Sequence, residues 1–428
     1  MSVSLSIIEV PSGAVWQSLY YSWMILRLFG LLVAYFTLAS AADWPQFLGP
    51  DRNGVYSGND ISPSWPASGL PVVWRKDVGE GFASPVVASG KLILFHRIGE
   101  NEVVDCLDAK TGAKVWSYFY RTTYRDDFGF DEGPRSAPVV AAGSIYTFGA
   151  QGVLSAIDFT TGKKRWAVET NALFKVKKGW FGAAGSPLVD DGRVLVHVGG
   201  PGAGIVAFDA QTGNVLWKAT NDEASYSSPS VATIGGERHA FFLTRAGVVD
   251  LDPSNGQVRF SFPWRSRNSA SVNAATPLVI GNQVFVSASY GAGAVLFEVN
   301  GSQYRKIWSN DESMSNHYST CVYFDGYLYG FHGRQEEGQA LRSVELKTGK
   351  VMWDLDGFGA GTVTLAGDRL LVLRENGELL LAPATPKEFK PVAHAAILKA
   401  VVRSYPAIAD GRLYARNEHS IICVRLSK

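Results

Sequence analysis

The stretch Asp209-Ala-Gln-Thr-Gly213-Asn-Val-Leu-Trp217 is one of several similar stretches, and their recurrence decides the fold of this chain. Near-copies occupy residues 108–116 and 158–166. Looser copies end at Phe260, Trp308 and Trp353, so that successive aromatic ends are 50, 51, 43, 48 and 45 residues apart. Asp-x-x-Thr-Gly predicts a tight turn, because Gly supplies a positive φ and the Asp side chain accepts hydrogen bonds from nearby backbone N–H groups. Recurrence at this spacing indicates a structural repeat.

A second element precedes each copy of the turn. It is a small residue followed by Pro, an apolar run, a Gly turn and a second apolar run, as in residues 84–94. Short β-branched runs bounded by Gly predict strands, so each repeat carries four of them. Four-stranded units of about 45 residues are typical of propeller blades. Complete repeats begin near Ser84, Ala137, Ser186, Ser228, Thr276, Ser319 and Gly361.

The last repeat is split between the two ends of the chain. Tyr405 to Leu426 supply three strands and then stop, and residues 71–76 supply a fourth strand that carries Trp74. We therefore predict an all-β fold, an eight-bladed β-propeller of four-stranded antiparallel blades closed by pairing of N- and C-terminal strands. The propeller is expected over residues 70–428, after an N-terminal segment at 42–69. A seven-bladed ring would leave one repeat outside.

The recurrent aromatic residue is expected to be structural. A large flat side chain on an outer strand can wedge between neighbouring blades and bury much apolar area. The seventh repeat lacks both the turn motif and this aromatic residue. The predicted docking residues are Trp74, Trp116, Trp166, Trp217, Phe260, Trp308 and Trp353.

Residues 1–41 are predicted to be an export signal. Arg27 precedes the apolar run 28–38, and Ala39-Ser40-Ala41 follows it, which is the order of a secretory signal. We expect cleavage before Ala42 and a natural start at Met24, with a retained N-terminal anchor as the alternative. The mature chain is then expected to be periplasmic or secreted, without a transmembrane span.

Composition narrows the function classes. The 40 Lys and Arg against 39 Asp and Glu give a net charge of +1, so nothing favours nucleic acid as a partner. Three cysteines, Cys106, Cys321 and Cys423, cannot form a disulfide framework in 428 residues and are interpreted as buried core. The seven His have no metal-ligand spacing, and no nucleophile elbow occurs. We expect a monomer.

Residues just before the first strand of each blade should lie near the mouth of the central channel. Aromatic rings with arginines there would suit a flat anionic ligand or a peptide. The alternative is that these side chains only fill the mouth. The candidate ligand-binding residues are Phe82, Arg135, Trp180, Tyr226, Asn273, His317, Tyr318 and Arg403, with Phe181, Phe358 and Tyr405 beside them.

The longest insertion, residues 121–135, is rich in acidic residues. Oxygen ligands such as these could hold calcium, although the spacing is not that of an EF-hand. A solvated acidic loop is the favoured interpretation, and no metal is expected. The weak candidates are Asp126, Asp127, Asp131 and Glu132.

The pattern Ala-x-Asp-x-x-Thr-Gly-x-x-x-Trp, at residues 156–166 and 207–217, resembles the tryptophan-docking repeat of pyrroloquinoline-quinone (PQQ) propellers, and residues 43–54 resemble the N-terminal segment of PQQ-like repeat proteins. The resemblance implies one of two branches. Quinoprotein dehydrogenases bind PQQ and calcium in the central funnel. Relatives such as the assembly factor BamB use the ring as a docking scaffold. The chain lacks the adjacent cysteine pair of the first branch and the lipid-attachment cysteine of the second.

These observations favour a non-catalytic protein- or ligand-binding scaffold without a cofactor, with an envelope protein or peptide as its partner. The alternative is a PQQ-dependent dehydrogenase of alcohols or sugars, with a carboxylate base. A carbohydrate-acting enzyme would need two facing carboxylates about 5–9 Å apart, which the mouth residues do not clearly offer.

Overall fold

The computed structural model describes Met1 and residues 43–427, except residues 67 and 270. The predicted signal peptide, its cleavage site and the start at Met24 lie outside the described residues. Residues 42–428 form one compact unit. Within the described ranges, no helix is long and apolar enough to cross a membrane.

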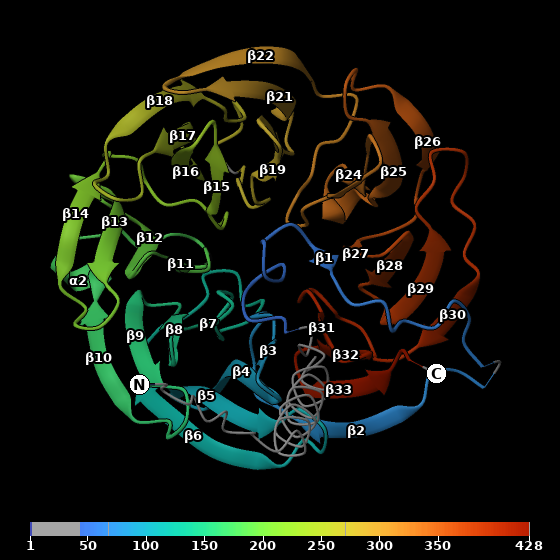
Figure 1. The fold of residues 1–428 in the computed structure, drawn as a ribbon, viewed down its shortest axis with the longest axis horizontal. Helices are drawn as coiled ribbons and strands as arrows, with labels where there is room; N and C mark the ends of the chain where they lie inside the picture. The colour runs from blue at the N-terminus through green and yellow to red at the C-terminus, as the bar shows by residue number, and fades with distance from the viewer. Residues whose placement is uncertain (2–42, 67, 270, 428) are drawn as a thin grey trace. The chain divides into compact units, whose positions relative to one another are not determined.

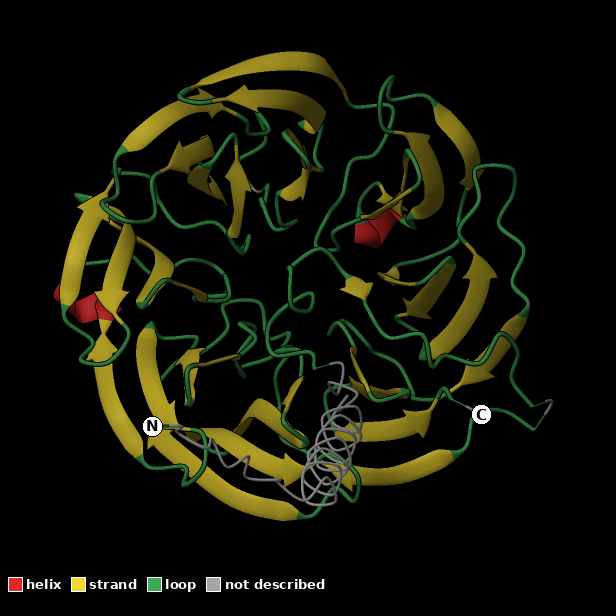
Figure 2. Cartoon of the chain, viewed as in Figure 1, coloured by secondary structure: helices red, strands yellow, loops and turns green. Residues whose placement is uncertain are grey.

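Eight sheets surround a central axis in chain order (Figure 1). Strands and loops make up nearly all of the described chain (Figure 2), with one short α-helix, α2 (Thr170–Leu173), and one 3₁₀ turn, η1 (Gln335–Glu337). The predicted eight-bladed propeller is confirmed, and the seven-bladed alternative is wrong.

The first four blades are listed here from the innermost strand outward. Blade 1 holds β3 (Val86–Ala88), β4 (Lys91–Ile98), β5 (Asn101–Asp108) and β6 (Lys114–Arg121). Blade 2 holds β7 (Val139–Ala141), β8 (Ser144–Phe148), β9 (Val153–Asp158) and β10 (Lys164–Glu169). Blade 3 holds β11 (Leu188–Asp190), β12 (Arg193–Gly200), β13 (Ala203–Asp209) and β14 (Val215–Ala219). Blade 4 holds β15 (Ser230–Ile234), β16 (Glu237–Leu243), β17 (Gly247–Leu251) and β18 (Val258–Pro263).

The other four blades follow the same order. Blade 5 holds β19 (Leu278–Ile280), β20 (Gln283–Ala288), β21 (Gly293–Asn300) and β22 (Gln303–Asn310). Blade 6 holds β23 (Val322–Phe324), β24 (Tyr327–His332), β25 (Ala340–Glu345) and β26 (Val351–Leu355). Blade 7 holds β27 (Gly361–Ala366), β28 (Arg369–Arg374), β29 (Glu378–Pro383) and β30 (Ala393–Ala396). Blade 8 holds β31 (Ala407–Ala409), β32 (Arg412–Arg416), β33 (Ser420–Arg425) and β2 (Val72–Asp77).

Blade 8 closes the ring as predicted. Strand β2 pairs antiparallel with β33, and Trp74 lies opposite Cys423 in the register. Because the outer strand comes from the start of the propeller and the inner three from its end, backbone hydrogen bonds join the two ends of the sequence. This pairing covers what would otherwise be an open edge of β33.

Each docking tryptophan reaches the turn of the next blade. Trp166 Nε1 donates to Ala210 O at 3.1 Å, and the Trp166 ring lies directly over Gly213. Trp74, Trp116, Trp217, Trp308 and Trp353 each donate from Nε1 to a backbone carbonyl of the following blade in the same way. The side chain of Phe260 has no N–H group to donate and packs instead on Tyr304, with ring centroids 4.9 Å apart.

The apolar core lies between the faces of neighbouring blades. One cluster joins Tyr146, Phe148 and Leu154 of blade 2 to Val196 and Phe208 of blade 3, all almost fully buried. The three cysteines are also buried and unpaired, as predicted.

Blade 7 departs from the regular pattern. Its outer strand β30 carries no aromatic residue. A fifth strand, β1 (Val55–Tyr56), pairs parallel with the innermost strand β27, which the sequence did not predict. Strand β1 belongs to the N-terminal segment, so this segment enters the ring.

The N-terminal segment runs along the inner strands at the centre of the ring (Figure 1). Trp44 exchanges two backbone hydrogen bonds with Val87 of β3, and Val140 N donates to Pro45 O. Arg52 is 2% exposed and donates to the carbonyl oxygens of Ser186 at 3.2 Å and Pro187 at 2.8 Å. The segment is therefore tied to inner strands on both sides of the channel.

Candidate functional site

A cavity of about 670 Å³ opens at the end of the ring where the innermost strands begin. Its lining includes Ser84, Ser186 and Ser228, which each stand a few residues before an innermost strand. Phe47, from the N-terminal segment, also lines it and packs edge-on against Tyr405 at 5.3 Å. The cavity thus lies at the channel mouth, with the N-terminal segment forming part of its floor.

The structure places most of the predicted mouth residues around this one cavity. The lining includes Phe82, Arg135, Trp180, Tyr226, His317, Tyr318 and Arg403, and also Phe181 and Tyr405. Asn273 is not in the lining. It is 2% exposed, and its amide donates to the carbonyls of Thr244 and Trp264. Phe358 packs against Phe331 and Phe389 instead. Ligand binding by the lining residues stays a prediction.

One wall of the cavity is aromatic. Phe181 contacts Phe128, Phe130 and Tyr226, with ring centroids 5.4, 6.3 and 5.5 Å apart. Phe128 and Phe130 are 55% and 58% exposed, so this apolar surface continues outside the cavity. The sequence favoured the 121–135 insertion as a binding surface beside the channel mouth, but it singled out only carboxylates within the insertion, so both phenylalanines were missed.

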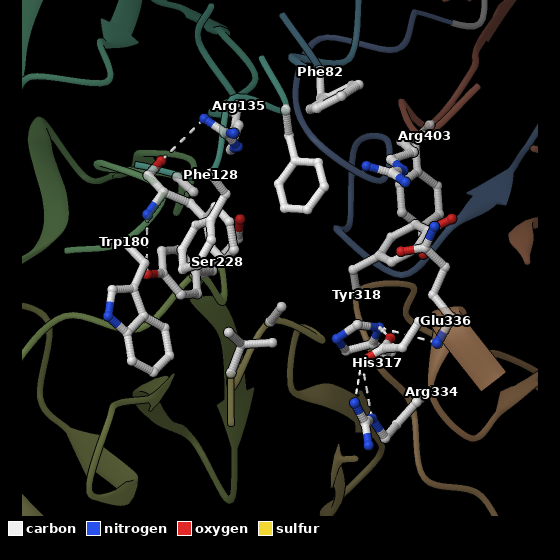
Figure 3. A pocket seen from close by; sticks show the side chains of 18 of the residues that line it. Phe82, Phe128, Arg135, Trp180, Ser228, His317, Tyr318, Arg334, Glu336 and Arg403 are labelled. Carbon is white, nitrogen blue, oxygen red and sulfur yellow. Dashed lines mark hydrogen bonds and ion pairs between the residues drawn. The ribbon is translucent and has the colours of Figure 1, made fainter. Parts of the chain in front are cut away.

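Two guanidinium groups flank the ring of Phe82 (Figure 3). Those of Arg135 and Arg403 lie 5.7 and 5.5 Å from its centroid. Arg135 also lies 5.5 Å from the Phe181 ring and donates to Phe181 O at 3.1 Å. Cations stacked on aromatic faces are held in place while their edges stay available for hydrogen bonds.

Glu375 holds the opposite, polar wall together. Its Oε1 accepts from Arg403 Nε and from Tyr318 Oη, both at 2.9 Å, and its Oε2 accepts from Gln335 Nε2 at 3.1 Å. Burial, reinforced by the Glu375 charge, raises the pKa of Tyr318 well above its ordinary value, so this phenol stays a donor. The arrangement fixes the direction of the Arg403 guanidinium.

His317 lies on the same wall in its neutral form. Its Nδ1 accepts from Gln335 N at 3.3 Å, which leaves Nε2–H to face Tyr290 Oη at 3.2 Å. Burial lowers the pKa of His317 to about 4. Tyr290 Oη in turn donates to Glu336 Oε1 at 3.3 Å, and Arg334 pairs with Glu336. The neutral imidazole therefore adds no charge to this cationic mouth.

The four acidic residues of the 121–135 insertion each have separate partners. Asp126 faces Arg135 at 3.4 Å, and Asp127 pairs with Lys178. Asp131 accepts hydrogen bonds from the backbone N–H groups of Gly81 and Gly133. Glu132 pairs with Arg97 and Arg125. Over residues 43–427, apart from 67 and 270, no three His, Cys, Asp or Glu side chains come together as a metal site would require.

A family model described as outer membrane protein assembly factor BamB matches residues 99–330, more than half of the chain. The chain belongs to the PQQ-like propeller family. BamB of Burkholderia pseudomallei is 23% identical over 357 residues, covering 73% of this chain and 87% of that protein. Quinohemoprotein alcohol dehydrogenase ADH-IIG of Pseudomonas putida is 30% identical over 156 residues, covering 35% of this chain and 21% of that enzyme. The solved structure of BamB from Moraxella catarrhalis superposes with a TM-score of 0.61 at 15% identity, over 83% of this chain and 97% of that one.

The two branches of the PQQ-like family are thus both represented among the relatives, but unequally. The match to the dehydrogenase covers only about a fifth of that enzyme, and the match to a second quinohemoprotein alcohol dehydrogenase, from Comamonas testosteroni, covers about a quarter of it. The match to the Burkholderia BamB runs along most of both chains.

The residues at the mouth do not fit PQQ bound together with a calcium ion. Glu336, which lines the cavity, and Glu375, which holds its polar wall together, are both bound to arginines, and among the described residues they do not converge with a third ligand. None of the three cysteines is in the lining, so no cysteine pair is placed to face the ring of PQQ. The arginines and aromatic rings of the lining suit PQQ, a flat anion, only without the calcium ion.

Proposed function

We propose that this PQQ-like propeller is an exported, non-catalytic scaffold that binds a protein or ligand at the channel mouth. The observation that carries the proposal is the 670 Å³ cavity, whose aromatic wall continues onto the exposed rings of Phe128 and Phe130. Exposed apolar patches and apolar cavities are features that mark interaction sites.

The internal pairing of the polar groups also supports a binding role. Tyr318, Arg403 and Gln335 all donate to Glu375, and the His317 imidazole is neutral. A carboxylate base for a dehydrogenase has to take a proton from the substrate, whereas Glu375 already accepts three hydrogen bonds. The geometry suits recognition better than proton transfer.

The site of action is proposed from the predicted signal sequence and from the relatives. The matched BamB proteins carry the name outer membrane protein assembly factor. We propose by analogy that this chain acts in the periplasm or cell envelope and that its partner is an envelope protein or peptide.

Site-specific crosslinking in cells tests the proposal. A benzoylphenylalanine replaces Phe128 at the mouth, and a matched control replaces Phe119, which is 64% exposed on the outer strand β6. We expect a discrete envelope protein or ligand adduct at position 128 that is absent at position 119. Identical adducts at both positions would contradict a binding site at the mouth.

A titration of the purified chain with PQQ, with and without calcium, tests the alternative. We expect no saturable binding that depends on calcium. Calcium-dependent micromolar binding, together with oxidation of an alcohol or sugar, would show that the protein is a dehydrogenase and would overturn the proposal.

A further inference from the structure

The charged side chains that line the mouth are mainly cationic. Three arginines, Arg135, Arg334 and Arg403, line the cavity together with a single acid, Glu336. Glu336 forms an ion pair with Arg334 at 2.5 Å and accepts a hydrogen bond from the hydroxyl of Tyr290. An occupant that carries negative charge is therefore complementary to the lining.

Arg403 is the arginine with donors left for an occupant. Its Nε donates to Glu375, and no described residue accepts a hydrogen bond from its two Nη groups. Arg135 differs, because its Nη groups already donate to Phe181 O, Asp131 O and Asp126. The free edge of a guanidinium matches a carboxylate in a two-point hydrogen bond.

The aromatic wall supplies a second contact point at a limited distance. Arg403 lies 5.5 Å from the Phe82 ring, the same ring lies 5.7 Å from Arg135, and Arg135 lies 5.5 Å from the Phe181 ring. The free guanidinium edge and the aromatic wall are therefore at most about 17 Å apart, which an extended chain of about five residues spans. Figure 3 shows Arg403 and Phe128 on facing walls of the cavity.

The exposed part of the aromatic wall favours a polypeptide over a small molecule. Phe128 and Phe130 stack on each other at 6.1 Å and remain more than half exposed. At the same wall, the Trp180 ring lies under the Arg245 guanidinium at 5.1 Å. A small ligand inside the cavity would cover only the faces of the Phe128 and Phe130 rings that line it, whereas a chain that crosses the rim also covers their exposed faces.

We propose that the mouth binds an acidic segment of a partner polypeptide that also carries an aromatic residue. An Asp or Glu carboxylate of the segment pairs with the Nη groups of Arg403. An aromatic side chain within about five residues of it packs on Phe128 and Phe181. Glu375 is a positioning residue, because it orients Arg403. This inference rests on the proposed scaffold function and specifies the chemistry of the partner.

Selection from a phage-displayed library of random heptapeptides tests the proposal with the purified chain. We expect enriched sequences to combine Asp or Glu with Phe, Tyr or Trp. Selection on an Arg403→Gln variant should lose the acidic residue but keep the aromatic one. Enriched peptides without an acidic residue, or with the same composition on both proteins, would overturn the proposal.

Binding measurements on the most enriched peptide give the magnitude. Arg403→Gln should weaken its affinity at least about tenfold, because hydrogen bonds to a charged group are lost. The matched control is Arg305→Gln, which also breaks an arginine–glutamate pair, but on the exposed outer strand β22. The control should change the affinity less than twofold. Equal effects of the two variants would refute the role of Arg403.

Two results separate this inference from the proposed function. If enriched peptides bind and a Phe128→Ala variant loses them, but no acidic residue is required, the mouth is a binding site and only the acidic specificity is wrong. If no peptide is enriched and calcium-dependent PQQ binding is found, both the inference and the scaffold function are wrong.

Discussion

Replacement of Gly213 by alanine tests how the tryptophan repeat stabilises the ring. Gly213 lies in the turn of blade 3 at φ +75°, and a Cβ atom built there would lie 2.7 Å from two ring carbons of Trp166. Trp166 is 9% exposed and donates to Ala210 O in the same turn. The added methyl group cannot fit unless the indole moves away from the turn.

Two effects contribute to the expected loss. An L-residue at this φ costs about 1–2 kcal/mol. Displacement of a packed ring by an extra methyl group costs about 1–3 kcal/mol more. Gly192, in the same blade, has φ +73° with no atom within 4 Å of its built Cβ, so Gly192→Ala carries the first cost alone. The difference between the two variants isolates the docking contact.

Urea denaturation followed by tryptophan fluorescence measures both variants. We expect Gly213→Ala to lower the free energy of unfolding by about 1–3 kcal/mol more than Gly192→Ala does. A Trp166→Phe variant should abolish most of that difference, because the smaller ring leaves room for the methyl group. Equal losses of unfolding free energy in the two glycine variants would show that packing of the Trp166 indole does not require a glycine at position 213.

Three further predictions concern buried groups. Arg52→Met should lower the free energy of unfolding by about 2–4 kcal/mol in urea denaturation, since two buried carbonyls lose their donor; an unchanged midpoint would contradict this. Burial lowers the folded-state pKa of His317 to about 4, below the ordinary 6.5, so its contribution to stability is complete above pH 6.5 and is lost as the pH falls toward 4. The stability difference between the wild type and His317→Asn should therefore shrink from pH 7 to pH 4, and a constant difference would refute the assignment. Burial raises the pKa of Cys106 to about 11 and those of Cys321 and Cys423 to about 12, so iodoacetamide should label no thiol until urea unfolds the ring, as mass spectrometry would show.

The fold could be predicted because each blade repeats the same local signals. Tight Asp-x-x-Thr-Gly turns and a following aromatic residue recur often enough to count blades and to find the split one. Strand β1 could not be predicted, because two residues carry no periodicity and their partners in the parallel strand β27 are 310 residues away in the sequence. The outer strand β30 also lacks the aromatic signal, and pairing with β29 rather than local sequence defines it.

Part of the site could be predicted from the positions of the innermost strands. Asn273 stands in the right place along the chain, but its side chain turns to the carbonyls of Thr244 and Trp264, which no local pattern reveals. Tyr290 and Glu375 were missed because only the loops before the innermost strands were considered. In an antiparallel blade, the hairpin between the second and third strands lies at the same end as those loops, and this alternation would have found both residues.

The same alternation separates the docking contacts between the blades from the candidate binding site. The tight Gly turns and the carbonyls that accept from the docking tryptophans lie at one end of the sheets, whereas the long loops around the cavity lie at the other. We therefore expect Phe128→Ala, a substitution at the exposed rim of the mouth, to leave the tryptophan docking contacts in place. The family match ends at residue 330, before Arg334, Glu375 and Arg403, which build the polar wall. The match does include the aromatic wall at Phe128 and Phe181 and the loop before β23 that carries His317, so the family pattern covers the aromatic wall of the candidate site and only part of the polar one.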